Sequence, residues 1–359
     1  MFTAADHRFM TQALRLAERG LYTASPNPRV GCVIVKHGRV VGEGWHERAG
    51  EPHAEIHALR QAGAEARDAE VYVTLEPCSH HGRTPPCADA LIEAGVGSVI
   101  AAMTDPDPRV AGQGLRLLEE RGIPVRSGLM ENEARELNRG FASRMTRQRP
   151  WVTLKVAASL DGRTALANGA SQWITGEAAR SDAQHWRARS CVVLTGIGTV
   201  LADDPQLTVR KFDIGRQPLR VVVDSHARIP PDRKILQGGN TLIACLSGKA
   251  EPLRAAGVAV LELPEKNGRV CLVSLMQALA ERGVNEVLVE AGAQLNGALL
   301  QAGLADELLC YFAPTLLGSD ARGMFAITPL ADMAQRIDLD LLALDRVGQD
   351  IRIRARPRR

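Results

Sequence analysis

The chain has 359 residues, of which 45% are hydrophobic and 24% charged, enough for two domains that each bury a core of their own. It carries 44 Lys and Arg against 41 Asp and Glu, and residues 1–150 carry 19 of each sign, which argues against a nucleic-acid-binding surface. The apolar runs are too short to span a membrane, and we expect a cytoplasmic protein. Seven cysteines, an odd number, argue against a disulfide framework and favour metal binding or core packing.

Helices and strands alternate in the pattern predicted for the first 150 residues. Helices are predicted over 3–20, 52–62, 87–94, a stretch that ends at Gly122, and 131–145. Strands are predicted over 29–36, 39–44, 70–75 and 98–102. Thr3 and Asp6 are the expected cap of the first helix, and His37-Gly38 is a hairpin signal. The alternation predicts an α/β layered domain.

A second unit is predicted to begin near Pro150. Residues 146–149 before it are polar, which suits an exposed connection, so we expect domains over 1–147 and 148–359. Strands are then predicted over 151–158, 191–195, 220–224, 241–245, 258–263, 284–290 and 306–313, with helices over 177–189, 274–282 and 293–301. The arginine-rich C-terminus is interpreted as a last strand and a solvated tail rather than a site for polyanions.

The most specific feature of the sequence is a set of three potential metal ligands. His53 opens a predicted helix, Cys78 follows a predicted strand, and Cys87 opens the next helix. One imidazole and two thiolates suit Zn²⁺, and three protein ligands leave a position for water, as in catalytic sites. Glu55 can take a proton from that water and pass it to a leaving amine. The pattern predicts hydrolysis of an amidine-like C–NH₂ group.

A structural zinc site is the alternative. His80 or His81 could supply a fourth ligand, but Glu55 would then have no role. The remaining cysteines lie in apolar runs or strands and are interpreted as packing residues. They are Cys32, Cys191, Cys245, Cys271 and Cys310.

The segment His53-Ala54-Glu55 and the two Pro-Cys pairs resemble the cytidine deaminase-like superfamily, whose signature is H-x-E followed by P-C-x-x-C. Eight residues separate Cys78 from Cys87, a longer insert than the signature has. With this insert, segments 26–31 and 50–55 are similar to the deaminase half of the bacterial bifunctional deaminase/reductase family of riboflavin biosynthesis. The resemblance covers the first domain. It implies substrate contacts for Asn27, His80 and Arg83.

The second unit has two turns that could hold phosphate. It lacks a G-x-G-x-x-G after its first strand, so the standard Rossmann fingerprint is missing. The small-residue turn 291–298 opens a helix whose backbone N–H groups could bind a pyrophosphate, and 196–199 is a second such turn. From spacing alone, a phosphate site and an ordinary connection between a strand and a helix are equally good interpretations of either turn.

Four segments, 154–163, 171–175, 198–205 and 289–292, are similar to the reductase half of the same family. The resemblance implies a dihydrofolate-reductase-like α/β domain, NADPH as its cofactor and a homodimer. It implies NADPH contacts for Ala157, Trp173, Thr199, Asp203, Ser225, Gly292, Ala293, Gln294, Leu295, Asn296, Gly297 and Ala298. It implies substrate contacts for Ser171, Arg187, Leu207, Arg210 and Glu290.

The resemblance also implies that this half opens and reduces a ribosylamine. That reaction requires proton transfer at the sugar nitrogen and oxygen while hydride reaches C1′. Lys155, Asp203 and Glu290 are the titratable residues of the matching segments and therefore the acid/base candidates, with a structural ion pair as the alternative for each. Arg187 and Arg210 suit the capture of a 5′-phosphate, although an arginine on a helix face is commonly a solvated group.

Together these features predict a cytidine deaminase-like α/β/α domain followed by a reductase domain in one bifunctional enzyme. The resemblance implies that the first is a zinc hydrolase that deaminates 2,5-diamino-6-(5-phosphoribosylamino)pyrimidin-4(3H)-one. It implies that the second is an NADP-dependent oxidoreductase that reduces the ribosyl group of 5-amino-6-(5-phosphoribosylamino)uracil to ribityl. We expect small-molecule substrates and neither nucleic acid nor membrane as partner.

Two other classes of function compete with this interpretation. A tRNA or polynucleotide deaminase needs a basic groove and stacking aromatic residues, whereas the first unit is neutral and poor in aromatic residues. A non-catalytic zinc-stabilised interaction module would unfold on chelation without any activity to lose. The presence of Glu55 beside the predicted ligands argues against such a module.

Overall fold

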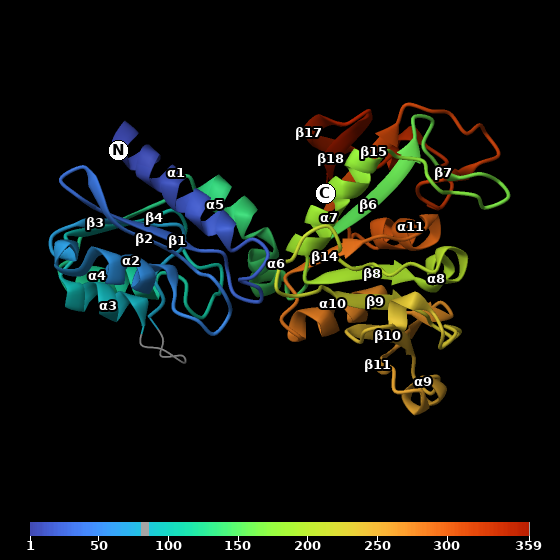
Figure 1. Cartoon of the computed structure of the whole chain (residues 1–359), viewed down its shortest axis with the longest axis horizontal. Coiled ribbons are helices and arrows are strands. Elements are labelled where there is room, and N and C mark those ends of the chain that lie inside the picture. The colour runs from blue at the N-terminus through green and yellow to red at the C-terminus, as the bar shows by residue number, and fades with distance from the viewer. Residues whose placement is uncertain (80–85, 359) are drawn as a thin grey trace. The chain divides into compact units, whose positions relative to one another are not determined.

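The computed structural model describes residues 1–79 and 86–358, which form two compact units, Met1–Gln148 and Arg149–Arg359. Each unit contains its own sheet (Figure 1). In the described part of the chain, no helix is both long and apolar enough to cross a membrane. The units are described separately below.

A five-stranded sheet with the order β2-β1-β3-β4-β5 forms the middle of the first unit. β1 pairs antiparallel with β2 and β3, while β3, β4 and β5 are parallel. The strands are β1 (Gly31–Lys36), β2 (Arg39–Trp45), β3 (Glu70–Val73), β4 (Ser98–Ala101) and β5 (Val125–Ser127). The predicted turn at His37-Gly38 is confirmed, because both residues have positive φ and join β1 to β2. β5 was not predicted.

Helices cover both faces of this sheet (Figure 1). α1 (Ala4–Arg19) packs on one face of the sheet, and α5 (Glu131–Leu137) lies beside it. The other face carries α2 (Ala54–Ala62), η1 (Gly63–Ala66), α3 (Cys87–Ala94) and α4 (Gln113–Glu120). The predicted cap of α1 is confirmed: Thr3 Oγ1 accepts from the Asp6 backbone, and the Asp6 carboxylate accepts from the Thr3 backbone. Pro52 lies before the first residue of α2 and not in its first turn as predicted.

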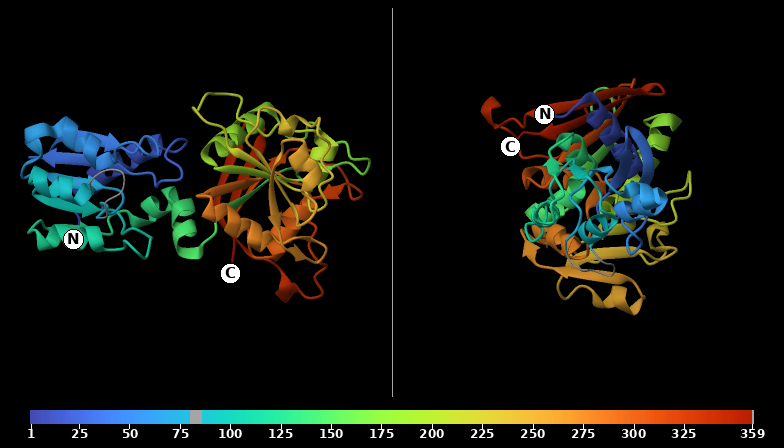
Figure 2. Two further views of the ribbon diagram at one scale, coloured as in Figure 1. Left: turned by 90° about the horizontal axis from the view of Figure 1, so that it is seen from below. Right: turned by 90° about the vertical axis from the view of Figure 1, so that its left-hand side faces the viewer.

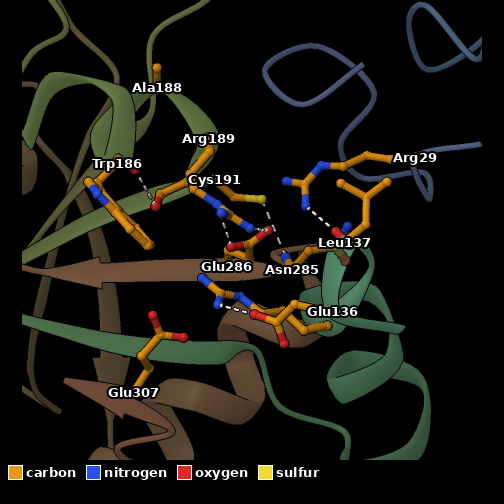
Figure 3. A network of polar contacts seen from close by, with 12 residues as sticks. Arg29, Glu136, Leu137, Trp186, Ala188, Arg189, Cys191, Asn285, Glu286 and Glu307 are labelled. Carbon is orange, nitrogen blue, oxygen red and sulfur yellow. Dashed lines mark hydrogen bonds and ion pairs between the residues drawn. The ribbon is translucent and has the colours of Figure 1, made fainter. Parts of the chain in front are cut away.

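The predicted single helix over 131–145 is two helices, α5 and α6 (Arg139–Arg147). They are separated at Asn138, whose side chain accepts from the Arg29 backbone N–H at 2.8 Å and donates to the Arg29 carbonyl at 2.9 Å. The Arg29 guanidinium also donates to the Leu137 carbonyl at 2.7 Å (Figure 3). These contacts with a residue far away in the sequence end α5. The predicted exposed connection at 146–149 is also corrected, since α6 continues to Arg147.

The second unit is built on a nine-stranded sheet with the order β11-β10-β9-β8-β14-β6-β15-β18-β17. The first seven are parallel to their neighbours, and β18 and β17 are antiparallel additions at one edge. The strands are β6 (Trp151–Ser159), β8 (Val192–Gly196), β9 (Leu219–Val223), β10 (Thr241–Leu246), β11 (Ala259–Leu263), β14 (Glu286–Val289), β15 (Glu307–Ala313), β17 (Leu339–Val347) and β18 (Asp350–Pro357). Two further two-stranded sheets pair β7 (Arg163–Ala165) with the distant β16 (Arg322–Gly323), and β12 (Glu265–Lys266) with β13 (Arg269–Val270) in a hairpin.

The strands of this sheet fan out with the usual twist, and helices lie on both sides of them (Figure 2). The helices are α7 (Glu177–Arg189), α8 (Ile197–Asp203), α9 (Glu251–Ala255), α10 (Leu272–Glu281) and α11 (Ala293–Gln301), with short turns η2 (Lys234–Leu236) and η3 (Met333–Gln335). The central parallel strands are buried on both faces, which explains their continuous runs of Val, Leu and Ile. At the amino end of β14, Arg189 pairs with Glu286 at 3.1 Å, and the Asn285 N–H donates to the Cys191 sulfur (Figure 3).

The C-terminal arginines were predicted to form a strand and a solvated tail. The strand is confirmed as β18, but two of its arginines are paired within the unit. Arg352 lies 2.8 Å from Asp182 of α7, and Arg354 lies 2.8 Å from the buried Glu307 of β15. These ion pairs fix one face of β18 against the rest of the sheet.

Candidate functional site

The three predicted metal ligands of the first unit lie together. His53 is the residue before α2, Cys78 follows β3, and Cys87 is the first residue of α3. Their potential ligand atoms all lie within 4.8 Å of one another, with His53 Nδ1 3.2 Å from Cys87 Sγ and 3.6 Å from Cys78 Sγ. The cysteine and histidine donors and their convergence fit a Zn²⁺ ion with three protein ligands.

Close packing of α2 on the sheet places His53. A Cβ on Gly44 would lie 2.2 Å from the Ala54 carbonyl, so only glycine allows α2 to start this close to β2. The thiols are placed by local hydrogen bonds: the backbone N–H of Cys87 donates to Cys78 Sγ at 3.3 Å. Contact with the Cys87 thiol lowers the pKa of Cys78 well below its usual range, which favours the thiolate form of Cys78.

Glu55 lies beside these ligands and is 3% exposed. Burial raises the pKa of its carboxyl group to about 7. In the described part of the chain its Oε2 has no hydrogen-bond partner. A buried carboxylate oxygen without a protein partner, next to a metal site, is suited to hold and release a proton of the reacting molecules.

A second buried carboxylate, Glu76, supports the site and was given no role by the sequence pattern. It is 4% exposed and accepts from three backbone N–H groups, those of Asp105 at 2.9 Å, Gly112 at 2.8 Å and Gly114 at 2.8 Å. It therefore fixes the segment before α4 against the chain that leads to Cys78. Its place directly before Pro77-Cys78, at the end of an apolar strand, was the available signal.

Replacing Glu76 by glutamine should weaken both the first unit and its metal site. The glutamine side chain turns an NH₂ group toward backbone N–H groups that need an acceptor, so at least one of their hydrogen bonds is lost. We expect this to lower the unfolding free energy by about 2–3 kcal/mol. We expect Zn²⁺ affinity to fall about tenfold to a hundredfold, because the hydrogen bonds that hold the segment of Cys78 in position are weakened. Denaturant unfolding and competition with a zinc chelator measure the two effects. Glu119→Gln, on the exposed side of α4, is the matched control, and an equal effect there would contradict this role.

Asn27, a predicted substrate contact, is connected to the metal ligands through a residue that was not predicted. Its side-chain nitrogen lies 3.0 Å from Nε2 of the buried His46, and the His46 ring packs edge-on against that of His53, with the ring centres 5.3 Å apart. The only signal for His46 was its position two residues after the predicted strand 39–44. The other predicted contacts, His80 and Arg83, and the alternative ligand His81, lie outside the described residues.

The site of the second unit is a cavity of about 2190 Å³. Residues that follow β8, β9 and β14, together with β6, contribute to its lining, so it lies at the carboxyl ends of parallel strands, where α/β sheets commonly bind ligands. Most of the predicted residues of this unit line it. They are Lys155, Ala157, Ser171, Trp173, Arg187, Thr199, Asp203, Leu207, Arg210, Ser225, Glu290, Gly292, Ala293, Gln294, Leu295 and Ala298.

Lys155, Arg187 and Glu290 form one charged cluster in this cavity, although they come from β6, α7 and the end of β14. Arg187 Nε lies 2.5 Å from Glu290 Oε1, its Nη2 donates to Oε2 at 3.0 Å, and Lys155 Nζ lies 3.8 Å from Oε2. Burial alone would raise the pKa of Glu290, but the charges of Arg187 and Lys155 lower it to about 2. Burial lowers the pKa of Lys155, and the charge of Glu290 opposes that effect. Glu290 is therefore ionised at neutral pH.

The two arginines predicted to capture phosphate differ in their surroundings. All three nitrogens of Arg187 already donate, two to Glu290 and Nη1 to the Thr208 carbonyl at 3.1 Å. Arg210 is exposed and donates through Nη1 to Gln206. Arg210 is therefore the better placed of the two for a phosphate. Asp203 is exposed at the end of α8, and no contact between it and Lys155 or Glu290 is found among the described residues.

The turn after β14 has the properties of a phosphate cradle. Gly292 precedes α11, whose first backbone N–H groups have no acceptors within the helix and line the cavity. Gly198 leaves open space where a side chain would stand. Two predicted residues of the turn point inward instead: Asn296 is buried and donates to the Ala291 carbonyl, and Gly297 packs against the backbone of Ala326. The turn therefore offers free backbone donors and open space, which a phosphate group requires.

Trp173 offers a flat apolar surface in the cavity. Its side chain is 71% exposed, and the guanidinium of Arg180 lies 4.6 Å above its ring. Arg180 in turn donates to the Thr175 carbonyl at 2.6 Å, which holds the pair in place. An exposed tryptophan in a cavity is a surface on which a planar ring can stack.

Comparison with known proteins gives two family matches. The cytidine and deoxycytidylate deaminase zinc-binding region matches residues 3–103, and the RibD C-terminal domain matches residues 150–353. The chain is 52% identical to the riboflavin biosynthesis protein RibD of Escherichia coli, over 96% of this chain and 98% of that protein. It is 47% identical to RibD of Haemophilus influenzae, over 99% of both chains.

Solved structures agree with these matches. The structure of Acinetobacter baumannii RibD superposes with a TM-score of 0.93 at 49% identity and covers 99% of both chains. A structure from Thermotoga maritima, described as a diaminohydroxyphosphoribosylaminopyrimidine deaminase/5-amino-6-(5-phosphoribosylamino)uracil reductase, gives a TM-score of 0.88 at 33% identity, over 98% of this chain and 99% of that one.

Proposed function

The chain belongs to the RibD family of riboflavin biosynthesis and is both a deaminase and a reductase, and we propose how its residues divide these two reactions. The observation that carries the proposal is the presence of two separate sites, His53, Cys78, Cys87 and Glu55 in one unit and the cavity around Lys155 and Glu290 in the other. The first would remove an amino group from the pyrimidine, and the second would reduce the ribosyl group.

In the deaminase site, we assign His53, Cys78 and Cys87 to hold Zn²⁺. When bound, the ion lowers the pKa of a coordinated water. The Glu55 carboxylate takes a proton from the attacking water and returns it to the departing amine. Its burial supports this role, as does its Oε2, which has no partner among the described residues and is available to the reacting molecules. Asn27 and His46 would bind the substrate beside the ligands.

In the reductase site, NADPH supplies the hydride. The Gly292 turn and the start of α11 would bind the phosphates of the cofactor, and Trp173 would cover a planar ring. Lys155 Nζ would donate a proton to the sugar as hydride reaches C1′, since burial already lowers its pKa. Glu290 would hold Lys155 in position, and Arg210 would bind the substrate phosphate.

One experiment tests this division of labour. Zinc-loaded protein is incubated with the diaminopyrimidine ribosyl phosphate, and ammonia release and NADPH absorbance are followed together. We expect ammonia without any nicotinamide cofactor and NADPH oxidation only after ammonia appears. NADPH oxidation that precedes deamination, or ammonia release after complete chelation of zinc, would contradict the proposed assignment.

We further propose that the enzyme is cytoplasmic and acts on small phosphorylated substrates without nucleic acid or membrane partners. The even balance of 44 basic and 41 acidic residues supports this. Weak retention on heparin or tRNA at physiological salt is the expected result. Strong, salt-dependent retention would favour a polynucleotide deaminase.

The exposed face of the β17–β18 hairpin supports a homodimer. The register places Leu341 opposite Ala355 and Leu344 opposite Ile353, so these side chains share one face of the hairpin. Leu341 is 62% and Leu344 63% exposed, and β17 is an edge strand within the described chain. An apolar face on an edge strand is a surface that a second copy would cover.

The double variant Leu341→Glu/Leu344→Glu should therefore be monomeric. Two carboxylates in an apolar interface are costly to desolvate, so we expect dimer affinity to fall at least about a hundredfold. Analytical ultracentrifugation measures the change. Leu201→Glu, an equally apolar but separate exposed position on α8, is the control. An unchanged sedimentation coefficient in the double variant would exclude this face as the interface.

A further inference from the structure

The far end of the reductase cavity is lined by basic side chains to which none of the roles above applies. Arg228 follows β9, and Lys266 and Arg269 belong to the β12–β13 hairpin; all three are exposed and line the cavity. Lys266 and Arg269 form no ion pair within the described residues. The carboxylates that line the cavity, Glu177, Asp203, Asp204 and Glu290, all belong to other segments.

The two hairpin cations lie directly opposite each other. Lys266 is the cross-strand partner of Arg269 in a two-residue ladder that turns at Asn267-Gly268, where both residues have positive φ. Like charges at such a position destabilise a hairpin. The arrangement is therefore unfavourable by itself and becomes favourable when an anion lies between or beside the two side chains.

The hairpin is tied to the segment that follows β9. The backbone N–H of Val270 donates to Ser225 Oγ at 3.0 Å, so the hairpin is held against the segment that contains Ser225 and Arg228. Arg228 is anchored only loosely, with its Nε 3.9 Å from Asp224. The Asp224 carboxylate is fully buried, accepts from the Ile229 backbone N–H at 2.8 Å and does not line the cavity. Asp224 therefore lies within ion-pair distance of Arg228 but, like Glu265 of the hairpin, does not line the cavity.

The order of the strands indicates which part of a bound cofactor lies near Arg228, Lys266 and Arg269. The charged cluster of Lys155 and Glu290 lies at β6 and β14, and the phosphate cradle at Gly292 and Gly198 follows β14 and β8. The next strand in the sheet is β9, roughly 14 Å from β6 at three strand spacings. A dinucleotide with its nicotinamide at the charged cluster and its pyrophosphate at the cradle extends its adenosine toward β9.

From this arrangement we infer that Arg228, Lys266 and Arg269 bind the 2′-phosphate of the adenosine ribose and make the enzyme select NADPH over NADH. The inference rests on the proposed position of NADPH in the cavity. The two cofactors differ only in this phosphate, which carries close to two negative charges at neutral pH. A group of cations without a lining carboxylate distinguishes them by charge.

Direct binding to the full-length protein tests this. NADP⁺, NAD⁺, adenosine 2′,5′-bisphosphate and AMP are titrated by calorimetry into wild type and into Lys266→Gln/Arg269→Gln. We expect the variant to bind NADP⁺ and the bisphosphate about tenfold more weakly, from two exposed charge contacts, and NAD⁺ and AMP within about twofold of wild type. In wild type, high salt should reduce the preference for NADP⁺.

The matched control is Arg121→Gln/Arg282→Gln, which removes two exposed arginines that do not line the cavity. The hairpin variant without ligand should unfold at the same temperature as wild type or a higher one, because the like-charge pair is gone. Arg228→Gln should add to the loss of NADP⁺ affinity. Equal loss for NADP⁺ and NAD⁺, or no loss for either, overturns the inference. Failure of wild type to bind any of the four compounds would instead contradict the proposed cofactor site.

Discussion

Replacing Glu55 by glutamine is expected to slow ammonia release by about a thousandfold while NADPH oxidation with the pre-deaminated uracil substrate continues at the wild-type rate. Glutamine has nearly the same shape, so the three ligand atoms within 4.8 Å of one another remain in place. It cannot accept a proton from the attacking water or return one to the amine. The loss is therefore specific to the deaminase site.

Two measurements make this result decisive. Zinc content, determined after dialysis, should equal that of wild type, because Glu55 is not among the proposed ligands. Glu93→Gln, a carboxylate of α3 outside the site, is the control for removal of one charge in the same unit. Loss of both activities in a folded, zinc-loaded Glu55 variant would contradict two independent sites.

The second large effect is expected from Glu290→Gln. The change removes the charge that Arg187 and Lys155 share at 2.5 Å and 3.8 Å, so the proton donor is no longer held in position. We expect reductase turnover to fall by at least about a hundredfold and deamination to stay unchanged. Leaving two largely shielded cations without their partner should also lower the unfolding free energy of the second unit by about 3 kcal/mol.

The pH dependence of stability separates these two effects. The pKa of Glu290 falls from 4.5 to about 2 on folding, so its contribution is present above about 4.5 and is lost as the pH falls toward 2. Wild type should lose this contribution across that range, and the glutamine variant should not. Denaturant unfolding between these pH values measures the difference. Parallel curves for the two proteins would mean that Glu290 is not the anchor of the cluster, and Glu281→Gln on α10 serves as the exposed control.

The sequence was sufficient for the metal site because its parts are local motifs. His53 and Cys87 stand at the start of a helix and Cys78 stands in the segment after β3, and such positions follow from periodicity and from the Pro-Cys pairs. The resemblance added the longer insert between the cysteines. Glu76 and His46 were missed since their partners, the backbone before α4 and the side chain of Asn27, come from other segments.

The same limit explains what was missed in the second unit and in the connection before it. Arg187 was predicted to contact a phosphate and lines the cavity, but its ion pair with Glu290, which follows a strand about 100 residues later, could not be predicted from the sequence. The break at Asn138 depends on Arg29, which no helical pattern near Asn138 contains. β17 has exposed leucines on one face, so its apolar pattern carried no signal of burial. Contacts between distant segments decided each of these features.

The strand order also has a consequence for how the chain folds during synthesis. All strands of the first sheet come from residues before Gln148, so this unit is complete when less than half of the protein has been made. β6, by contrast, lies between β14 and β15, which begin at Glu286 and Glu307. The centre of the second sheet must wait for the last part of the chain, and such long-range pairing is slow. During translation the hydrolytic half therefore forms first, and β6 remains an unpaired apolar strand until the ribosome has nearly finished.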